Sequence, residues 1–461
     1  MTLRRIVTLI AVCAVVAALP RLGFAQAVPQ YSIINVNPTG TIGTPTGIND
    51  DYQVVGNDAT GKGFVWMPGV PSFHFDPTVS DTHYYAYTIN NLGEVGGTAW
   101  NTALSAAVSV GVWAPSTYFG TTYSLIYSLG GVNAVDWPGA ALALNDDDYL
   151  CGTLQDSSMA PKTFDGVEVT STTAVSYIAD NYEYTGISNI FEDMCGTNLG
   201  VSPTQAIFSP NFFTPPSTTT LLAGGTFGGV TYATPSVASG IDDADNVVGA
   251  AHNSVTGNSE AFAWNGRTGA PYGPLGFLHN TDYSVANAIN TSTGIVIGQS
   301  GEHAFLWSGD VTNPSAGAMT DLNSLVQSNS GWRLVKAVGL NDDGAIVGTG
   351  YYQQKQAGFI AIPVIISSIT MDSPSVVGGN TLAGTITLDA PAPFDMNVTV
   401  TTYSASLNFG TGIYSAGVVV LAGDTTARFV VHSTSVTVDT PVTLKATFGG
   451  WRRYAKVDVL P

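Results

Sequence analysis

The chain has few charged residues and very few basic ones. Of its 461 residues, 14 are Lys or Arg and 33 are Asp or Glu, so the formal net charge is −19. Proteins that bind nucleic acid neutralise its phosphates with clustered Lys and Arg. We therefore do not expect nucleic acid as a partner.

Glycine and proline, by contrast, are frequent. The chain has 52 Gly and 24 Pro, and 10% of its residues are aromatic. This composition favours short strands and tight turns, and it excludes an all-helical bundle. With 44% apolar residues the chain can bury a sizeable core, so disorder is excluded as its main state. The length predicts about two or three folded units.

Long apolar runs are missing except at the N-terminus. There, Arg4 and Arg5 precede an apolar run from Ile6 to Leu19, and Ala25-Gln26-Ala27 forms a small-x-small cleavage site. The run is about 14 residues long, which is too short to cross ~30 Å of hydrocarbon. The pattern predicts a signal peptide over residues 1–27 and no membrane span. The protein is expected to be secreted or at the cell surface, with the periplasm as the other compartment.

A short sequence phrase recurs along the chain, and repeats of this kind determine the architecture. The phrase is an aliphatic residue, usually Asn, an acidic or polar turn, small apolar residues and then Gly. The average spacing of about 49 residues suits a sheet of four strands per copy. The seven copies begin at Ile48, Ile89, Leu144, Ile187, Ile241, Ile289 and Leu340.

Each copy is expected to contribute four strands. The first strand ends at the aliphatic residue, a tight turn follows, and the second strand contains the Gly. The third strand carries an aromatic box such as Gly63–Trp66 or Ala304–Trp307. The fourth strand often leads into glycines, as at Gly225–Gly229.

The ends of the repeat region predict how the sheets close. The seventh copy stops after its third strand, at Ala361-Ile362, while Tyr31–Val36 is a strand that belongs to no copy. Pairing of Tyr31–Val36 with Gly358–Ile362 would hide both edges. Residues 28–362 therefore predict a seven-bladed β-propeller. The alternative is an open solenoid, whose terminal sheets would be uncapped.

These repeats resemble a known family, the HAF extracellular repeats, which take their name from a run present here as His303-Ala304-Phe305. The Ile-Asn turn, the Val-Val-Gly strand, the Ala-Phe-x-Trp box and the Leu-Gly-Gly segment occur together over most of residues 28–362. The third, fourth and seventh copies lack the Trp. The resemblance implies exported, propeller-like repeats, and it supplies no catalytic residues.

Residues 363–461 differ from the repeats, because the phrase disappears and alternating Thr and Val residues replace it. Seven short strands in this segment predict an immunoglobulin-like β-sandwich, similar to the modules appended to bacterial surface proteins. The segment lacks the cysteine pair of antibody domains, and Pro363 leaves hardly any linker. The expected strands are Ile365–Met371, Gly384–Leu388, Asn397–Thr402, Gly417–Leu421, Arg428–His432, Val442–Phe448 and Tyr454–Leu460.

The sequence contains no recognisable catalytic or cofactor-binding motif. The histidines are scattered, with no two at metal-ligand spacing, so each is expected to be a surface or strand residue. We therefore assign no catalytic, cofactor-binding or metal-ligating residues. A catalytic pair of carboxylates contributed by loops of different blades is the alternative that the sequence leaves open. The histidines are His74, His83, His252, His279, His303 and His432.

The acidic turns are the strongest polar feature of the chain. All join a first strand to a second strand, so they emerge on one face, and they hold 13 acidic residues. Turn chemistry explains them, because Asp and Asn accept hydrogen bonds from nearby backbone. Calcium is the alternative ligand, although neither candidate run has EF-hand spacing. The two runs are Asp146, Asp147 and Asp148, and Asp242, Asp243 and Asp245.

Two functions fit these features. The first is a non-catalytic binding or scaffold protein, acting as a monomer, that presents its loops to an extracellular protein or glycan. The second is a secreted polysaccharide hydrolase or lyase that uses loop carboxylates as acid and base.

The two cysteines beyond the signal segment test the repeat alignment. Cys151 and Cys195 each precede the Gly of a copy, so they occupy equivalent positions in consecutive sheets. Packed sheets lie about 10 Å apart, whereas a disulfide needs Cα atoms within about 7 Å. We predict two separate buried thiols.

Overall fold

The computed structural model describes most of the chain beyond the N-terminal segment. Every regular element in it is a β-strand, apart from two 3-10 helices, η4 (Pro314–Ala316) and η5 (Leu322–Leu325). The expected all-β class is confirmed. The predicted signal peptide lies outside the described residues. These are 30–36, 43–68, 70–74, 82–101, 106–115, 123–128, 139–155, 161–168, 177–178, 182–210, 220–279, 283–290, 294–326, 330–389, 391–392, 395–421, 423–448 and 451–461.

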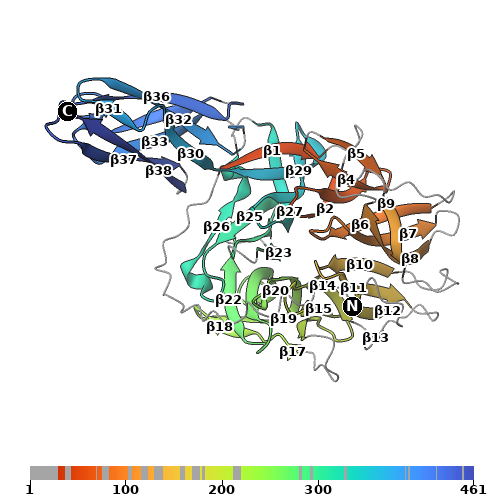
Figure 1. Cartoon of the computed structure of the whole chain (residues 1–461). Coiled ribbons are helices and arrows are strands. Elements are labelled where there is room, and N and C mark those ends of the chain that lie inside the picture. Colours follow the sequence, from red (N-terminus) through yellow and green to blue (C-terminus); the bar gives the residue numbers. More distant parts are fainter. Residues whose placement is uncertain are drawn as a thin grey trace, which may run out of the picture.

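Seven antiparallel sheets precede residue 365 in the described part of the chain, and Figure 1 shows them arranged around a circle. The first contains β2 (Gly43–Ile48), β3 (Val54–Asp58), β4 (Gly63–Met67) and β5 (Val70–His74). The second contains β6 (Thr82–Ile89), β7 (Val95–Asn101), β8 (Ala106–Pro115) and β9 (Tyr123–Ser128). The third contains β10 (Gly139–Leu144), β11 (Tyr149–Gln155), β12 (Pro161–Glu168) and β13 (Tyr177–Ile178).

The remaining four sheets continue in chain order. The fourth contains β14 (Tyr182–Ile187), β15 (Met194–Asn198), β16 (Gln205–Ser209) and β17 (Thr220–Leu221). The fifth contains β18 (Gly225–Phe227), β19 (Val230–Ile241), β20 (Asn246–Asn253), β21 (Ser259–Asn265) and β22 (Pro271–Gly276). The sixth contains β23 (Ser284–Ile289), β24 (Val296–Ser300), β25 (His303–Ser308) and β26 (Ala318–Asp321). The seventh contains β27 (Trp332–Leu340), β28 (Ile346–Tyr352), β29 (Lys355–Val364) and β1 (Gln30–Val36).

The repeat phrase marks the same structural position in every sheet. In six sheets the aliphatic residue is the last residue of the first strand and the Gly lies in the second strand. In the fifth sheet, which has the extra edge strand β18, the corresponding strands are β19 and β20, and we call these its first and second strands from here on. Opposite each Gly, the first strand has a bulge, as between Pro45 and Gly47 or between Ala337 and Gly339. A Cβ at Gly56 or Gly348 would overlap a carbonyl oxygen of the bulged strand. The bulge therefore explains why Gly recurs at this position.

The seven sheets close on themselves, because each first strand contacts the preceding sheet and β2 contacts β27 and β28. Strand β1 completes the seventh sheet beside β29, with Tyr31 opposite Pro363 and Val36 opposite Gly358. The predicted pairing of the N-terminal strand is thus confirmed. We call the seven sheets together the sheet ring.

Aromatic residues of the third strands fill the spaces between neighbouring sheets. Phe64 packs with Val36 and Val347 across the seam between the first and seventh sheets. Phe305 and Trp307 pack with residues of the fifth sheet. The side chains of Phe64, Phe305 and Trp307 are almost fully buried, whereas Trp66 of the first sheet is 9% exposed. Removing their apolar surface from water stabilises the contacts between the sheets.

One predicted fourth strand belongs to a different sheet. Gly225–Gly229 was expected to end the fourth sheet, but β18 forms a hairpin with β19 at the edge of the fifth. Gly228 and Gly229 have φ values of +58° and +84°, which are the left-handed conformations that a two-residue hairpin turn needs. Because of this local turn, β18 pairs with β19, the strand that follows it in the sequence, and not with the third strand of the fourth sheet.

The two cysteines are free thiols and both are buried, so the prediction of two separate thiols is confirmed. Cys151 lies in β11 among Tyr184, Met194 and Ile207, whereas Cys195 lies in β15 in the next core cluster. Burial raises the pKa of the Cys195 thiol to about 12. These thiols act as small apolar core residues.

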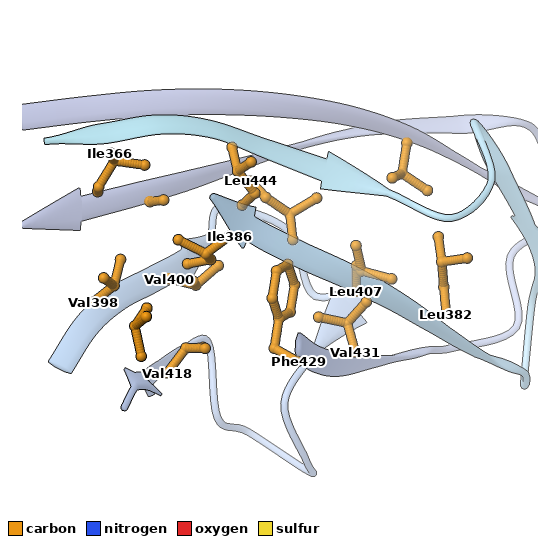
Figure 2. Packing of buried hydrophobic residues seen from close by; sticks show 14 of the residues in the cluster. Ile366, Leu382, Ile386, Val398, Val400, Leu407, Val418, Phe429, Val431 and Leu444 are labelled. Atoms are coloured by element: carbon orange, nitrogen blue, oxygen red, sulfur yellow. The ribbon is translucent and has the colours of Figure 1, made fainter. Parts of the chain in front are cut away.

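Residues 366–460 form two further sheets that pack face to face over one core (Figure 2). Phe429 extends from one sheet into the middle of this core, which also contains Ile386, Val400 and Leu444. All seven predicted strands are present, together with the short strands β31 and β34. The first sheet has β30 (Ile366–Met371), β32 (Thr381–Leu388), β36 (Thr426–Ser433) and β34 (Leu407–Asn408). The second has β31 (Ser375–Val377), β38 (Trp451–Leu460), β37 (Thr440–Phe448), β33 (Met396–Thr402) and β35 (Ser415–Val420).

Our first prediction concerns ring closure through β1. The Tyr31 side chain is fully buried among residues of the sixth and seventh sheets, including Leu306 and Phe359. Tyr31→Ala should therefore lower the free energy of unfolding by about 3–5 kcal/mol, measured by denaturant titration. Tyr31→Phe keeps the aromatic packing and should change it by less than about 1 kcal/mol. Closure would be contradicted by a deletion of residues 28–37 that leaves the melting temperature unchanged.

Candidate functional site at the turn end

Among the described residues, six of the seven turns between first and second strands share one design, in which a single side chain closes its own turn. The Asn49 Oδ1 atom accepts the Gln53 backbone N–H at 3.0 Å, and Asn341 Oδ1 accepts that of Ala345 at 2.7 Å. A residue near the end of the turn, just before the second strand begins, has a positive φ, as at Asp148 (+66°) and Gly344 (+83°). This geometry explains why Asn or Asp follows the aliphatic residue.

The same Asn side chains also tie each turn to the next one around the ring. Their Nδ2 groups donate to the backbone carbonyl of the corresponding residue in the neighbouring sheet. These Asn residues are almost fully buried, so the bonds are shielded from water. The bonds run from Asn49 to Asn90 (3.0 Å), Asn90 to Asn145 (3.1 Å), Asn145 to Ser188 (3.1 Å), Asn290 to Asn341 (2.6 Å) and Asn341 to Asn49 (3.2 Å).

A second set of hydrogen bonds lies outside the first, one residue further along each turn. Here the backbone N–H donates to the side-chain oxygen of the equivalent residue in the next turn. Asp50, Asp146 and Asp243 act as acceptors in this set, so their carboxylates have a structural role. The bonds run from Asp50 to Asn91 (2.9 Å), Asn91 to Asp146 (2.7 Å), Asp146 to Asn189 (3.0 Å), Asn189 to Asp243 (2.7 Å) and Asp342 to Asp50 (2.8 Å).

An arginine connects the fourth and fifth turns, where the Asn pattern is broken. Ser188 and Asp242 stand at the Asn position and have no amide group to donate. Arg267, in the β21–β22 turn, donates to Asp193 Oδ2 at 2.9 Å and forms a short ion pair with Asp245. The two carboxylates are almost completely buried, whereas the guanidinium is half exposed. This hydrogen bond with Asp245 raises the pKa of Arg267.

Within the described part of the chain, no Lys or Arg forms an ion pair with the equivalent acids between the second and third turns. Glu94 and Asp148 share a side-chain hydrogen bond, and Glu94 Oε2 also accepts from Asn90 Nδ2 at 3.1 Å. Burial, followed by the neighbouring Asp148, raises the pKa of Glu94 from 4.5 to about 7. Below that pKa, Glu94 carries a proton that it can share with Asp148, which reduces the repulsion between the two acids as Arg267 does at the other junction.

The tips of the turns form the accessible part of this end. Leu92 is 46% exposed, Ile190 is 63% exposed and Phe191 is 44% exposed. Asp147 and Asp343 are the exposed tips of the third and seventh turns. The turn end is therefore an acidic surface with apolar tips from the second and fourth sheets.

The predicted calcium residues separate into several roles. Asp146 and Asp243 accept hydrogen bonds from neighbouring turns, Asp242 closes its own turn, and Asp245 binds Arg267. Burial raises the pKa of Asp242. Among the described residues, no group of three or more His, Cys, Asp or Glu is arranged to hold a metal ion. Calcium at these turns stays a prediction.

The structure brings together two histidines whose spacing along the chain does not suggest a pair. His279 follows β22 and His303 begins β25, yet their ring centroids are 5.4 Å apart. His303 Nδ1 also lies 2.8 Å from Asp321 Oδ2. His74 Nε2 lies 3.0 Å from Asp58 Oδ2 in the first sheet. The sheet topology creates both contacts, so spacing along the chain does not reveal them.

Comparisons with known proteins assign the chain to no family. No family model matches it, and no curated protein matches it. Within the described residues, no helix is long and apolar enough to cross a bilayer.

Several solved structures show weak similarity. The Pseudomonas fluorescens alkylpurine DNA glycosylase AlkC bound to DNA is 16% identical over 21% of this chain and 30% of its own length, with a TM-score of 0.16. A structure described as the basis for Dscam isoform specificity is 9% identical over 94% of this chain and 100% of its own, with a TM-score of 0.16. E. coli alpha-2-macroglobulin is 8% identical over 94% of this chain and 34% of its own, with a TM-score of 0.15. Scores this low carry no argument about fold or function.

The second prediction concerns Arg267. Arg267→Met should leave the buried carboxylates of Asp193 and Asp245 without a cation and lower the free energy of unfolding by about 3 kcal/mol. This value is at the low end of the range for a buried pair because the guanidinium is half exposed. Arg333→Met is the control, since its partner Glu302 is mostly exposed and its loss should cost less than about 1 kcal/mol. Equal losses in denaturant titrations would show that the Arg267 contacts are not structural.

The third prediction concerns the pH dependence that Glu94 causes. Because its pKa is higher in the folded protein than the ordinary value of 4.5, the folded state loses stability as pH rises from 4.5 to about 7. Glu94→Gln stays neutral and can still donate to Asp148. It should melt at a higher temperature than the parent at pH 8 and at no higher temperature at pH 4. The control is Glu302→Gln, and a Glu94→Gln profile parallel to the parent would refute the shared proton.

Proposed function

We propose that the chain is an exported, monomeric, non-catalytic binding protein that presents the turn end of its sheet ring to an extracellular protein or glycan. In this proposal, residues 1–27 are a signal peptide, residues 28–362 are a seven-bladed β-propeller of the HAF type, and residues 363–461 are an immunoglobulin-like sandwich. The circle of seven sheets closed by β1 supports the propeller, and the two packed sheets over one core support the sandwich.

The observation that carries the binding function is the exposure of apolar tips on the turn end. Leu92 and Ile190 extend from turns whose buried atoms are held by the inter-turn hydrogen bonds. Exposed apolar side chains held on a rigid frame are available to a partner, because their burial costs no reorganisation. Asp147 lies on the turn between them and adds negative charge.

The alternative is a polysaccharide hydrolase or lyase, which needs two carboxyl groups about 5–10 Å apart that can act as acid and base. The carboxyl groups of Glu94 and Asp148 share a hydrogen bond and are closer than that. Asp193 and Asp245 are neutralised by Arg267. Neither pair has the geometry of glycoside hydrolysis, so the binding function is favoured.

The fourth prediction distinguishes the two functions. When the purified protein is screened against an immobilised panel of polysaccharides, we expect retention without new reducing ends or unsaturated products. Ile190→Asp should weaken binding to a retained glycan about tenfold or more. Val255→Asp is the control, because Val255 is 72% exposed at the opposite end of the fifth sheet. Release of product from any glycan would favour the enzyme instead.

A further inference from the structure

A second cluster of functional groups lies at the end of the sheet ring opposite the turn end. Strand β25 begins there with His303, and the chain leaves β22 there toward His279. Asp321, at the end of β26, completes the group. The cluster thus joins the fifth and sixth sheets, and neither the turn hydrogen bonds nor the proposed binding surface uses it.

The spacing of the two imidazoles is the spacing that a shared metal ion requires. Imidazole nitrogens bind Zn²⁺ at about 2.0–2.1 Å, and two of them at a tetrahedral angle place the ring centroids about 5 Å apart. The observed separation is 5.4 Å, with the ring planes tilted by 59°. The centroid separation is therefore close to that of two histidines on one ion.

His303 is already oriented as a ligand. The Asp321 carboxylate accepts a hydrogen bond from Nδ1 at 2.8 Å, which leaves the Nε2 lone pair on the opposite side of the imidazole. Asp321 is itself fixed, because its Oδ1 atom accepts the Asn323 N–H at 2.9 Å at the start of η5. A carboxylate bound to the second nitrogen of a ligand histidine is the usual outer contact of zinc sites.

The segment that carries His279 is held against the same sheet. The backbone N–H of Leu278 donates to Ser300 Oγ at 3.1 Å, and Ser300 is fully buried at the end of β24. Ser300 lies directly opposite His303 in the ladder. His279 is exposed, so an ion from solution can reach it. Because an imidazole has two nitrogens, His279 can keep another contact and still bind a metal.

We propose that His279 and His303 bind one divalent transition-metal ion of the Zn²⁺ class, with Asp321 as the residue that positions His303. Two histidines and water complete such a centre, so it does not require a third protein ligand. Borderline-soft ions prefer imidazole, whereas calcium prefers oxygen ligands. Arg333, the nearby cation on β27, is paired with Glu302. The ion would bridge the fifth and sixth sheets.

The fifth prediction is measured by calorimetric titration of the protein, purified without a polyhistidine tag, with ZnCl₂. We expect one ion per chain, and a loss of affinity of at least tenfold in His279→Ala and in His303→Ala. Asp321→Asn should weaken binding by about 10–100-fold, and Asp321→Glu should recover part of the loss. His432→Ala, at an exposed position in β36, is the control and should bind as the parent does.

Melting temperatures separate a role in binding from a role in folding. His279 is exposed, so His279→Ala should keep the melting temperature of the metal-free parent while it loses zinc. Asp321→Asn that binds zinc normally would remove Asp321 from the proposal. No zinc binding by the parent, or unchanged affinity in His279→Ala, would overturn the site itself.

Discussion

The hydrogen bonds of the buried asparagine that begins five of the seven turns are the interactions on which the sheet ring depends. One side of its amide accepts backbone N–H groups of its own turn, and the other side donates to the carbonyl of the next turn. A buried amide with both sides satisfied is stabilising, whereas one with a lost partner is costly. The same residue therefore fixes the shape of a turn and the angle between two sheets. The bulged first strands add to these ties, since Thr46 and Asn287 each donate to a carbonyl of the following sheet.

Two junctions bring buried acidic side chains together, and different chemistry maintains the contact between neighbouring sheets at each of them. Arg267 links two buried carboxylates at one junction, and Glu94 shares a hydrogen bond with Asp148 at the equivalent place in another. Both solutions remove the repulsion between acids that the ring geometry brings together. The high acidic content of the repeats is thus largely a consequence of turn and junction structure. A large negative charge alone is consequently a weak indication of metal binding or acid catalysis in this fold.

The sequence predicted those features that repeat locally. The first-strand ends at Ile48 and Leu340 and the thiol positions of Cys151 and Cys195 follow from one recurring phrase, and pairing of β1 with β29 follows from one missing strand. The inter-turn bonds could not be predicted, because their partners are about 50 residues apart and contact each other only once the sheets stand side by side. The same reason hid the proximity of His279 to His303. The hairpin of β18 was missed because the Gly228-Gly229 turn reads equally well as the end of the preceding repeat.

Within the turns, the first two positions are constrained by hydrogen bonds, whereas the third position varies in residue type. The third position is therefore where functional side chains can be placed. The first two turn positions are held by hydrogen bonds in nearly every described copy, and their residues are Asn, Asp or Ser except for Thr291 in the sixth copy. The next position lies outside those two sets of bonds, and it holds Asp51, Leu92, Asp147, Ile190, Ala244 and Asp343 in six of the copies. At one of these positions, Asp343 Oδ2 accepts a hydrogen bond from Tyr52 of the first turn at 3.2 Å. A ring built from one phrase can thus present a different side chain from each sheet without loss of stability. In the proposed binding function, specificity would belong to the tips, because they can change while the bonds beneath them are kept.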